Sequence, residues 1–131
     1  IIDERSINTI KEGTFEKYDE YLSYKKSSLI NVHGGSFTYL INLPKQGYYK
    51  VYAWWPTFDN NSHSNIDYLI AHSKGWTKKT VNQSILGGQW NPLGYYHFDK
   101  NADHKVILSS TTNVTLIVDA IRIEFIGQER P

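Results

Sequence analysis

The sequence contains no cysteine and no methionine among its 131 residues. The lack of cysteine excludes disulfides, thiolate nucleophiles, iron–sulfur clusters and cysteine zinc sites. The 14 Lys and Arg residues nearly balance the 13 Asp and Glu residues. We expect no nucleic-acid partner, because such binding depends on concentrated positive charge. No apolar run approaches the ~20 residues of a membrane helix, so we expect no membrane insertion. The chain does not begin with Met, and we interpret it as a mature chain or an excised domain.

The sequence patterns of common catalytic and metal sites are also missing. It contains no His-Glu-x-x-His, no Gly-x-Ser-x-Gly, no phosphate-binding glycine loop and no calcium loop. Surface or hydrogen-bonding roles are favoured over zinc binding for His63 and His72. One polar set could hold a hard cation through its oxygens, although a solvated loop is the favoured interpretation; its members are Asp59, Asn60, Asn61 and Asp67. We therefore predict no enzyme activity, no cofactor and no metal site.

What the sequence does contain is a series of short strand patterns separated by turn signals. Apolar and polar residues alternate along residues 36–43, as in a half-buried strand. Strands are predicted at Ser36–Leu43, Tyr48–Trp55, Ile66–His72, Trp76–Gln83, Leu93–Phe98, His104–Ser109 and Val114–Ile126. For Thr9–Lys26 a meandering edge segment is favoured over a helical turn. These short, regularly spaced strands predict an all-β antiparallel jelly-roll β-sandwich, formed by residues 1–131 as a single domain.

The last predicted strand, Val114–Ile126, carries apolar residues on both faces. This is typical of a central strand or of a strand with a bulge. Asp119 lies in the middle of this apolar run, where a charged carboxylate must be hydrogen-bonded or paired. We interpret Asp119 as a structural anchor rather than as a catalytic acid or metal ligand.

Aromatic residues are the most informative feature, with Trp 4, Tyr 10 and Phe 5. If Lys50 faces water, alternation places Tyr52 and Trp54 together on the exposed side of their strand. Trp76 adds a further aromatic side chain at a loop edge, whereas core or end packing is favoured for Trp55 and Trp90. Exposed rings of this kind need a covering partner, and a flat ring beside polar groups suits the C–H face and hydroxyls of a sugar. We predict Tyr52, Trp54 and Trp76 as carbohydrate-stacking platforms, with Asn60, Asn61, His63 and Lys50 as polar partners of the same ligand.

Three stretches, in this order and spacing, resemble the golvesin/xanthan-lyase C-terminal-like domain. They are Tyr49-Lys50-Val51-Tyr52-Ala53-Trp54-Trp55-Pro56, then Val81-Asn82-Gln83 with Gly87-Gly88-Gln89-Trp90-Asn91-Pro92-Leu93-Gly94, and Val118-Asp119-Ala120-Ile121-Arg122. The resemblance covers about residues 36–126, and a fainter similarity reaches Ile1-Ile2-Asp3. The residues of this motif suit a structural role better than a binding role. Gly87, Gly88 and Gly94 permit tight backbone paths, and Trp90 is expected to plug the sandwich end. Asn82, Gln83 and Asp119 are expected to satisfy buried backbone groups.

The resemblance implies a non-catalytic jelly-roll accessory module that binds carbohydrate. Such modules are appended to secreted polysaccharide lyases, peptidoglycan amidases and surface proteins, more often in bacteria than elsewhere. We therefore predict a domain that anchors a secreted enzyme or surface protein to a polysaccharide or cell-wall glycan. Its predicted location is extracellular or at the cell surface. The alternative is a structural or adhesive module whose exposed aromatics bury against protein neighbours in a bacterial surface assembly.

Overall fold

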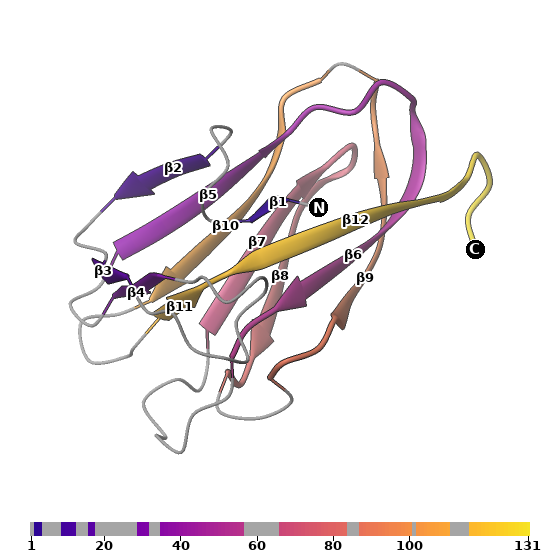
Figure 1. Cartoon of the computed structure of the whole chain (residues 1–131). Helices are drawn as coiled ribbons and strands as arrows, with labels where there is room; N and C mark the ends of the chain where they lie inside the picture. Colours follow the sequence, from indigo (N-terminus) through magenta and orange to yellow (C-terminus); the bar gives the residue numbers. More distant parts are fainter. Residues whose placement is uncertain are drawn as a thin grey trace.

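The computed structural model describes residues 2–3, 9–12, 16–17, 29–31, 35–56, 66–83, 87–100, 102–110 and 116–131. Each secondary-structure element in these residues is a β-strand (Figure 1). The strands are β1 (Ile2–Asp3), β2 (Thr9–Glu12), β3 (Glu16–Lys17), β4 (Leu29–Asn31), β5 (Gly35–Ile41), β6 (Gly47–Trp54), β7 (Ile66–His72), β8 (Gly75–Val81), β9 (Asn91–Phe98), β10 (His104–Ser110), β11 (Leu116–Val118) and β12 (Ala120–Gly127).

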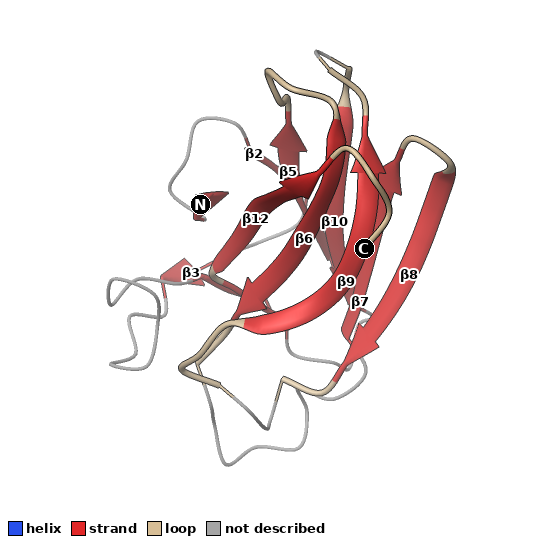
Figure 2. Cartoon of the chain, turned by 90° about the vertical axis from the view of Figure 1, so that its right-hand side faces the viewer, coloured by secondary structure: helices blue, strands red, loops and turns tan. Residues whose placement is uncertain are grey.

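Most of these strands belong to two antiparallel sheets that face each other across one core. The four-stranded sheet has the order β1-β12-β6-β9, and the five-stranded sheet has the order β2-β5-β10-β7-β8. A small third sheet consists of β11, β4 and β3. Figure 2 shows β12, β6 and β9 as one layer and β10, β7 and β8 as the other. The predicted all-β, antiparallel sandwich is confirmed.

The core is built by alternation of buried and outward residues, which is clearest along β5 and β6. In β6 every second residue is buried, and Val51 and Ala53 are fully inaccessible to solvent. In β5 the buried residues include Phe37 and Tyr39, which pack against the inner side of the facing sheet as part of one core cluster. Fully burying one such large apolar side chain contributes about 1.5–3 kcal/mol. The sequence alternation therefore fixes which side chains remain on the two outer faces.

The N-terminal strands β2 and β3 lie at the edges of two different sheets. β2 pairs only with β5 among the described strands, and β3 pairs only with β4. This arrangement agrees with the predicted meandering edge segment at Thr9–Lys26. Residues 13–15 and 18–26 of that segment lie outside the described residues.

The prediction of one continuous strand at Val114–Ile126 was wrong. The chain forms β11 and β12 instead, which pair with different strands: β11 with β4, and β12 with β6 and β1. The break falls at Asp119, which is 1% exposed and whose backbone carbonyl accepts a hydrogen bond of 2.9 Å from the Tyr39 hydroxyl. Because β11 and β12 belong to different sheets, adjacent residues on both sides of Asp119 are buried, and periodicity alone interprets this run as one strand covered on both faces.

A buried glutamine ties β11 to the five-stranded sheet. The Gln83 side chain is fully buried, donates to the Ile117 carbonyl at 2.9 Å and accepts from the Ile117 N–H at 3.0 Å. Its amide also donates to the Tyr68 hydroxyl at 3.2 Å, and burial raises the pKa of that hydroxyl far above its ordinary value. The expectation that Gln83 satisfies buried backbone groups is confirmed, so this part of the motif is scaffold.

Candidate functional site

The outer side of β6 carries three of the residues predicted to bind carbohydrate. Lys50, Tyr52 and Trp54 alternate with the buried residues Val51 and Ala53, so all three side chains lie on the outer surface of the four-stranded sheet. The structure therefore places them together, as the alternation predicts. Each of the three is half-buried rather than fully exposed.

Tyr52 is held between charged neighbours from two strands. The Lys50 Nζ lies 5.0 Å from the centre of the Tyr52 ring, and the Arg122 guanidinium carbon lies 5.2 Å from it. The Tyr52 hydroxyl donates to Glu124 Oε1 at 3.1 Å, and Arg122 pairs with the other oxygen of Glu124 at 3.0 Å. Contacts between a cation and an aromatic ring contribute about 0.5–1 kcal/mol each at exposed sites. These contacts fix the position of the ring before any ligand arrives.

Trp54 packs against Trp90, which comes from the loop before β9. The two ring systems meet edge to face, with their centres 5.2 Å apart and an interplanar angle of 76°. Such pairs contribute about 0.5–1.5 kcal/mol beyond the area they bury. Tyr52 and Trp54 lie together on the outer side as predicted, but each is half-buried rather than exposed, because the outward side chains partly cover one another. Trp90 is likewise half-buried, not a plug enclosed in the sandwich end.

Tyr95 is a candidate binding residue that sequence reasoning did not select. It lies opposite Lys50 in the pairing of β6 with β9, it is 49% exposed, and Lys50 Nζ lies 5.4 Å from its ring centre. The alternation in β9 is interrupted at a bulge near Gly94, so the strand pattern alone is ambiguous. Phe98 and Tyr96 are both buried, so alternation from the C-terminal end of β9 places the Tyr95 side chain on the outer side.

We call this outer surface of the four-stranded sheet the aromatic face. Its residues are Lys50, Tyr52, Trp54, Trp90, Tyr95, Arg122 and Glu124. The interaction with the Tyr52 side chain raises the pKa of Lys50 above its ordinary value, so Lys50 carries a positive charge near neutral pH. The aromatic face thus combines flat rings with charged hydrogen-bond donors and one carboxylate. Such a surface can stack on an apolar ring face and hydrogen-bond to hydroxyls around it.

Trp76 lies on the opposite side of the sandwich. It is part of β8, at the edge of the five-stranded sheet, and it pairs with Ala71 of β7. The Trp76 side chain is 56% exposed, and Lys105 Nζ lies 5.9 Å from the centre of its ring. The structure therefore does not bring Trp76 together with Tyr52 and Trp54.

Three other predicted binding residues, Asn60, Asn61 and His63, lie outside the described residues, as does Asp59. Asp67 belongs to β7, where its carboxylate accepts a hydrogen bond of 2.7 Å from the Thr80 hydroxyl. In the part of the chain that the structure describes, no group of three or more His, Asp or Glu side chains is arranged to hold a metal ion. The described residues also contain no helix with the length and hydrophobicity required to cross a membrane.

Comparison with known proteins agrees with this architecture. Residues 4–125 match the family model of the Golvesin C-terminal domain. The xanthan lyase of Bacillus sp. (strain GL1) is 28% identical over 96 residues, covering 70% of this chain and 10% of that protein. The structure of Paenibacillus xanthan lyase superposes with a TM-score of 0.89 at 26% sequence identity, covering 96% of this chain and 13% of that chain. The chain thus spans only about a tenth of the length of these relatives. Because the family model covers nearly the whole sequence, the chain belongs to the family of golvesin C-terminal domains.

Proposed function

We propose that residues 1–131 form a single non-catalytic accessory domain that binds carbohydrate. In this proposal the domain anchors a secreted enzyme or surface protein to a polysaccharide or cell-wall glycan, outside the cell or at its surface. The observation that carries the proposal is the aromatic face, where the rings of Tyr52 and Tyr95 lie beside Lys50 and Trp54 packs against Trp90. Support also comes from the similarity to two xanthan lyases, which are named for a polysaccharide.

The proposed binding mode uses the rings and charges of the aromatic face together. A sugar ring stacks its C–H face on the accessible part of Tyr95, Tyr52 or Trp54, and its hydroxyls accept hydrogen bonds from Lys50 and Arg122. If each stacked ring contributes about 0.5–1.5 kcal/mol, by analogy with aromatic pairs, a few contacts give weak binding. A total of about 4–8 kcal/mol corresponds to dissociation constants between millimolar and micromolar. Weak single contacts suffice for an anchor, because a polymer offers many of them.

Trp76 has a separate place in the proposal. Because β8 belongs to the other sheet, Trp76 would contact the glycan independently of the aromatic face, on the far side of the domain. The predicted polar partners Asn60, Asn61 and His63 remain part of the proposal, without a structural position.

The experiment that tests the proposal is retention of the purified chain on soluble and insoluble polysaccharides, peptidoglycan included, with and without calcium. We expect saturable retention on one glycan class, and loss of about tenfold in affinity for Tyr52→Ala, the effect of one aromatic contact. Tyr52→Phe is the matched control, because it keeps the ring and removes only the hydroxyl with its polar contacts to Glu124 and Lys50. Thermal unfolding verifies that each variant is folded. A folded chain that binds no glycan, or a Tyr52→Ala variant that binds as well as the parent, contradicts the proposal.

A protein-interaction module is the second candidate, and the outer face of the five-stranded sheet favours it. Trp76 and Leu40 are 56% and 40% exposed there. Leu40 is the strand partner of Lys105, and Lys105 Nζ lies 5.9 Å from the centre of the Trp76 ring. Exposed apolar side chains of this kind can bury against a neighbouring protein. Light scattering at increasing protein concentration tests self-association through this face. A chain that remains strictly monomeric argues against this candidate.

A further inference from the structure

A pocket with positively charged walls lies next to the aromatic face, where the turn between β7 and β8 meets β9. The backbone N–H of Ser73 in that turn donates to the His97 carbonyl of β9 at 2.9 Å, which holds the two sheets together at this end. The pocket has a volume of about 250 Å³. This is smaller than the ~300–1,000 Å³ of pockets for drug-sized ligands, so it suits a single monosaccharide unit.

Four side chains that carry or can accept a positive charge line this basic pocket. His72 and Lys74 come from the β7–β8 hairpin, His97 comes from β9, and Arg130 follows β12. Among the described residues that line the pocket, none carries a carboxylate. Within the same described part of the chain, neither Lys74 nor Arg130 forms an ion pair. Among the described residues, the charges of Lys74 and Arg130 are therefore not neutralised inside the pocket, whereas His97 lies 3.8 Å from the carboxylate of Asp99.

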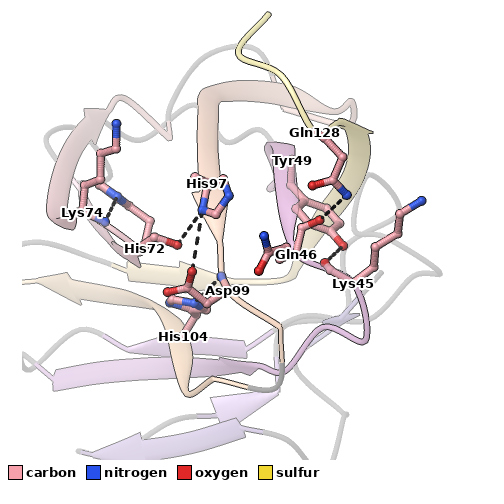
Figure 3. A network of polar contacts seen from close by, with 10 residues as sticks. Lys45, Gln46, Tyr49, His72, Lys74, His97, Asp99, His104 and Gln128 are labelled. Atoms are coloured by element: carbon pink, nitrogen blue, oxygen red, sulfur yellow. Dashed lines mark hydrogen bonds and ion pairs between the residues drawn. The ribbon is translucent and has the colours of Figure 1, made fainter.

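The two histidines are held in fixed orientations by their neighbours (Figure 3). His72 Nδ1 accepts a hydrogen bond of 3.2 Å from the backbone N–H of Lys74, so in the neutral ring the proton lies on Nε2 and is donated to Thr77 Oγ1 at 2.8 Å. Thr77 also lines the pocket, and its own hydroxyl proton remains available as a donor. The Nδ1 atom of His97 lies 2.9 Å from the Ser73 hydroxyl and 3.8 Å from Asp99, which leaves Nε2 as the ring nitrogen without a described protein partner.

Tyrosine rings form the remaining wall and connect the pocket to the aromatic face. Tyr96 stacks on His72 with ring centres 5.2 Å apart, and Tyr48 meets the edge of His97 at 5.1 Å. Tyr95 lines the pocket and also lies beside Lys50 on the aromatic face. A ligand in the pocket can therefore continue along the outer surface of the four-stranded sheet.

We propose that the basic pocket binds the carboxylate of an acidic sugar unit, a uronic acid residue, in a glycan whose neighbouring units lie on the aromatic face. Lys74 and Arg130 supply charge-assisted hydrogen bonds to the carboxylate, Thr77 and His97 supply further donors, and the tyrosine rings contact the sugar. The inference rests on the proposed function, because it identifies the chemical class of glycan that the domain selects. Burial, and then the charges of His104 and Lys74, lower the pKa of His72, so this ring serves as a neutral wall and Lys74 and Arg130 supply the positive charge.

The test compares methyl β-D-glucuronide with methyl β-D-glucoside, which lacks only the carboxylate. Nuclear magnetic resonance follows the imidazole signals of His72 and His97 and the backbone amides of Lys74 and Thr77. We expect saturable shifts with the glucuronide, none at the same concentration of glucoside, and about tenfold weaker glucuronide binding in Lys74→Gln, the loss expected for one charge-assisted hydrogen bond. Lys78→Gln is the matched control, because it removes the same charge from β8 outside the pocket and leaves binding unchanged.

Further outcomes separate this inference from the proposed function. Shifts of equal size with inorganic phosphate and no preference for the glucuronide overturn the inference, since they show a site for small anions in general. Retention on polysaccharide through Tyr52 with no shift at His72 or His97 also overturns it and leaves the proposed function intact. Glucuronide shifts in a chain that no polysaccharide retains support the pocket but contradict the role of the aromatic face as an anchor.

Discussion

The two outer faces of the sandwich present their aromatic and charged side chains in different ways. On the aromatic face, Tyr52 is contacted by two cations and by Glu124, while Trp54 packs against Trp90. On the outer face of the five-stranded sheet, Trp76 is 56% exposed, and among the described residues Lys105 is the cation near its ring. Both sheets contribute buried side chains to the same core cluster, and the difference lies in the outward side chains. Under the proposed function, the fixed side chains of the aromatic face are preorganised for the glycan, whereas the isolated Trp76 ring is not.

The largest expected effect concerns the scaffold that both faces share. Gln83→Ala leaves the N–H and carbonyl of Ile117 without the partners that lie at 3.0 and 2.9 Å. An unsatisfied buried polar group costs about 1–3 kcal/mol, so we expect the free energy of unfolding to fall by about 3 kcal/mol. Chemical denaturation measures this change. The matched control is Gln89→Ala, whose side chain is exposed and whose effect should stay within about 0.5 kcal/mol. A similar stability for both variants would show that the buried amide does not tie β11 to the sheet.

The second prediction concerns the bulge that sets the position of Tyr95. Gly94 has a φ of +122°, and a Cβ at this residue would lie 2.9 Å from the Tyr96 hydroxyl oxygen. We expect Gly94→Ala to lower the free energy of unfolding by about 2 kcal/mol, from backbone strain and steric conflict together. It should also weaken glycan binding by displacing Tyr95. Gly75→Ala is the control, because Gly75 has a φ of +115° and nothing within 4 Å of a Cβ. If both alanine variants lose the same stability in denaturation, strain alone explains the effect.

The third prediction compares the two faces directly. Trp54→Ala removes a ring from a preorganised pair, so we expect glycan affinity to fall about tenfold, as for one aromatic contact. Trp76→Ala removes an isolated ring, and we expect a loss of less than about threefold. Affinity electrophoresis in polysaccharide-containing gels measures both variants side by side. A larger loss for Trp76→Ala would reverse the comparison and make the five-stranded sheet the principal binding surface.

Much of the fold could be predicted from the sequence, because alternation along a half-buried strand is a local signal. The predicted strand at Ile66–His72 coincides with β7, and the outward direction of Lys50, Tyr52 and Trp54 was correct. The break at Asp119 could not be predicted, because it depends on which strands lie beside each half of the segment. Periodicity carries no information about sheet membership.

The candidate site was less predictable than the fold. Outward direction is local, but the partners of an outward side chain come from strands that are distant in sequence. Arg122 and Glu124 reach Tyr52 only because β12 pairs with β6, and Trp76 is separated from Trp54 only because β8 belongs to the other sheet. The composition identified aromatic residues as the informative class, but only the strand order shows which of them share a face.

The smallest expected effect is a pH dependence at the basic pocket, where the two sheets meet. Burial, and then the charges of His104 and Lys74, lower the pKa of His72 in the folded chain. As the pH decreases through about 6.5, His72 becomes protonated in the unfolded chain but remains neutral in the folded chain. The free energy of unfolding must therefore fall as the pH decreases through and below this value. We expect His72→Gln to flatten this part of the curve of unfolding free energy against pH, measured by denaturation between pH 8 and pH 5.

Saturation with methyl β-D-glucuronide should flatten the same part of the curve, because a bound carboxylate favours the protonated His72 ring. An unchanged slope in His72→Gln would assign the pH dependence to other groups, and an unchanged slope with the glucuronide would separate His72 from the anion site.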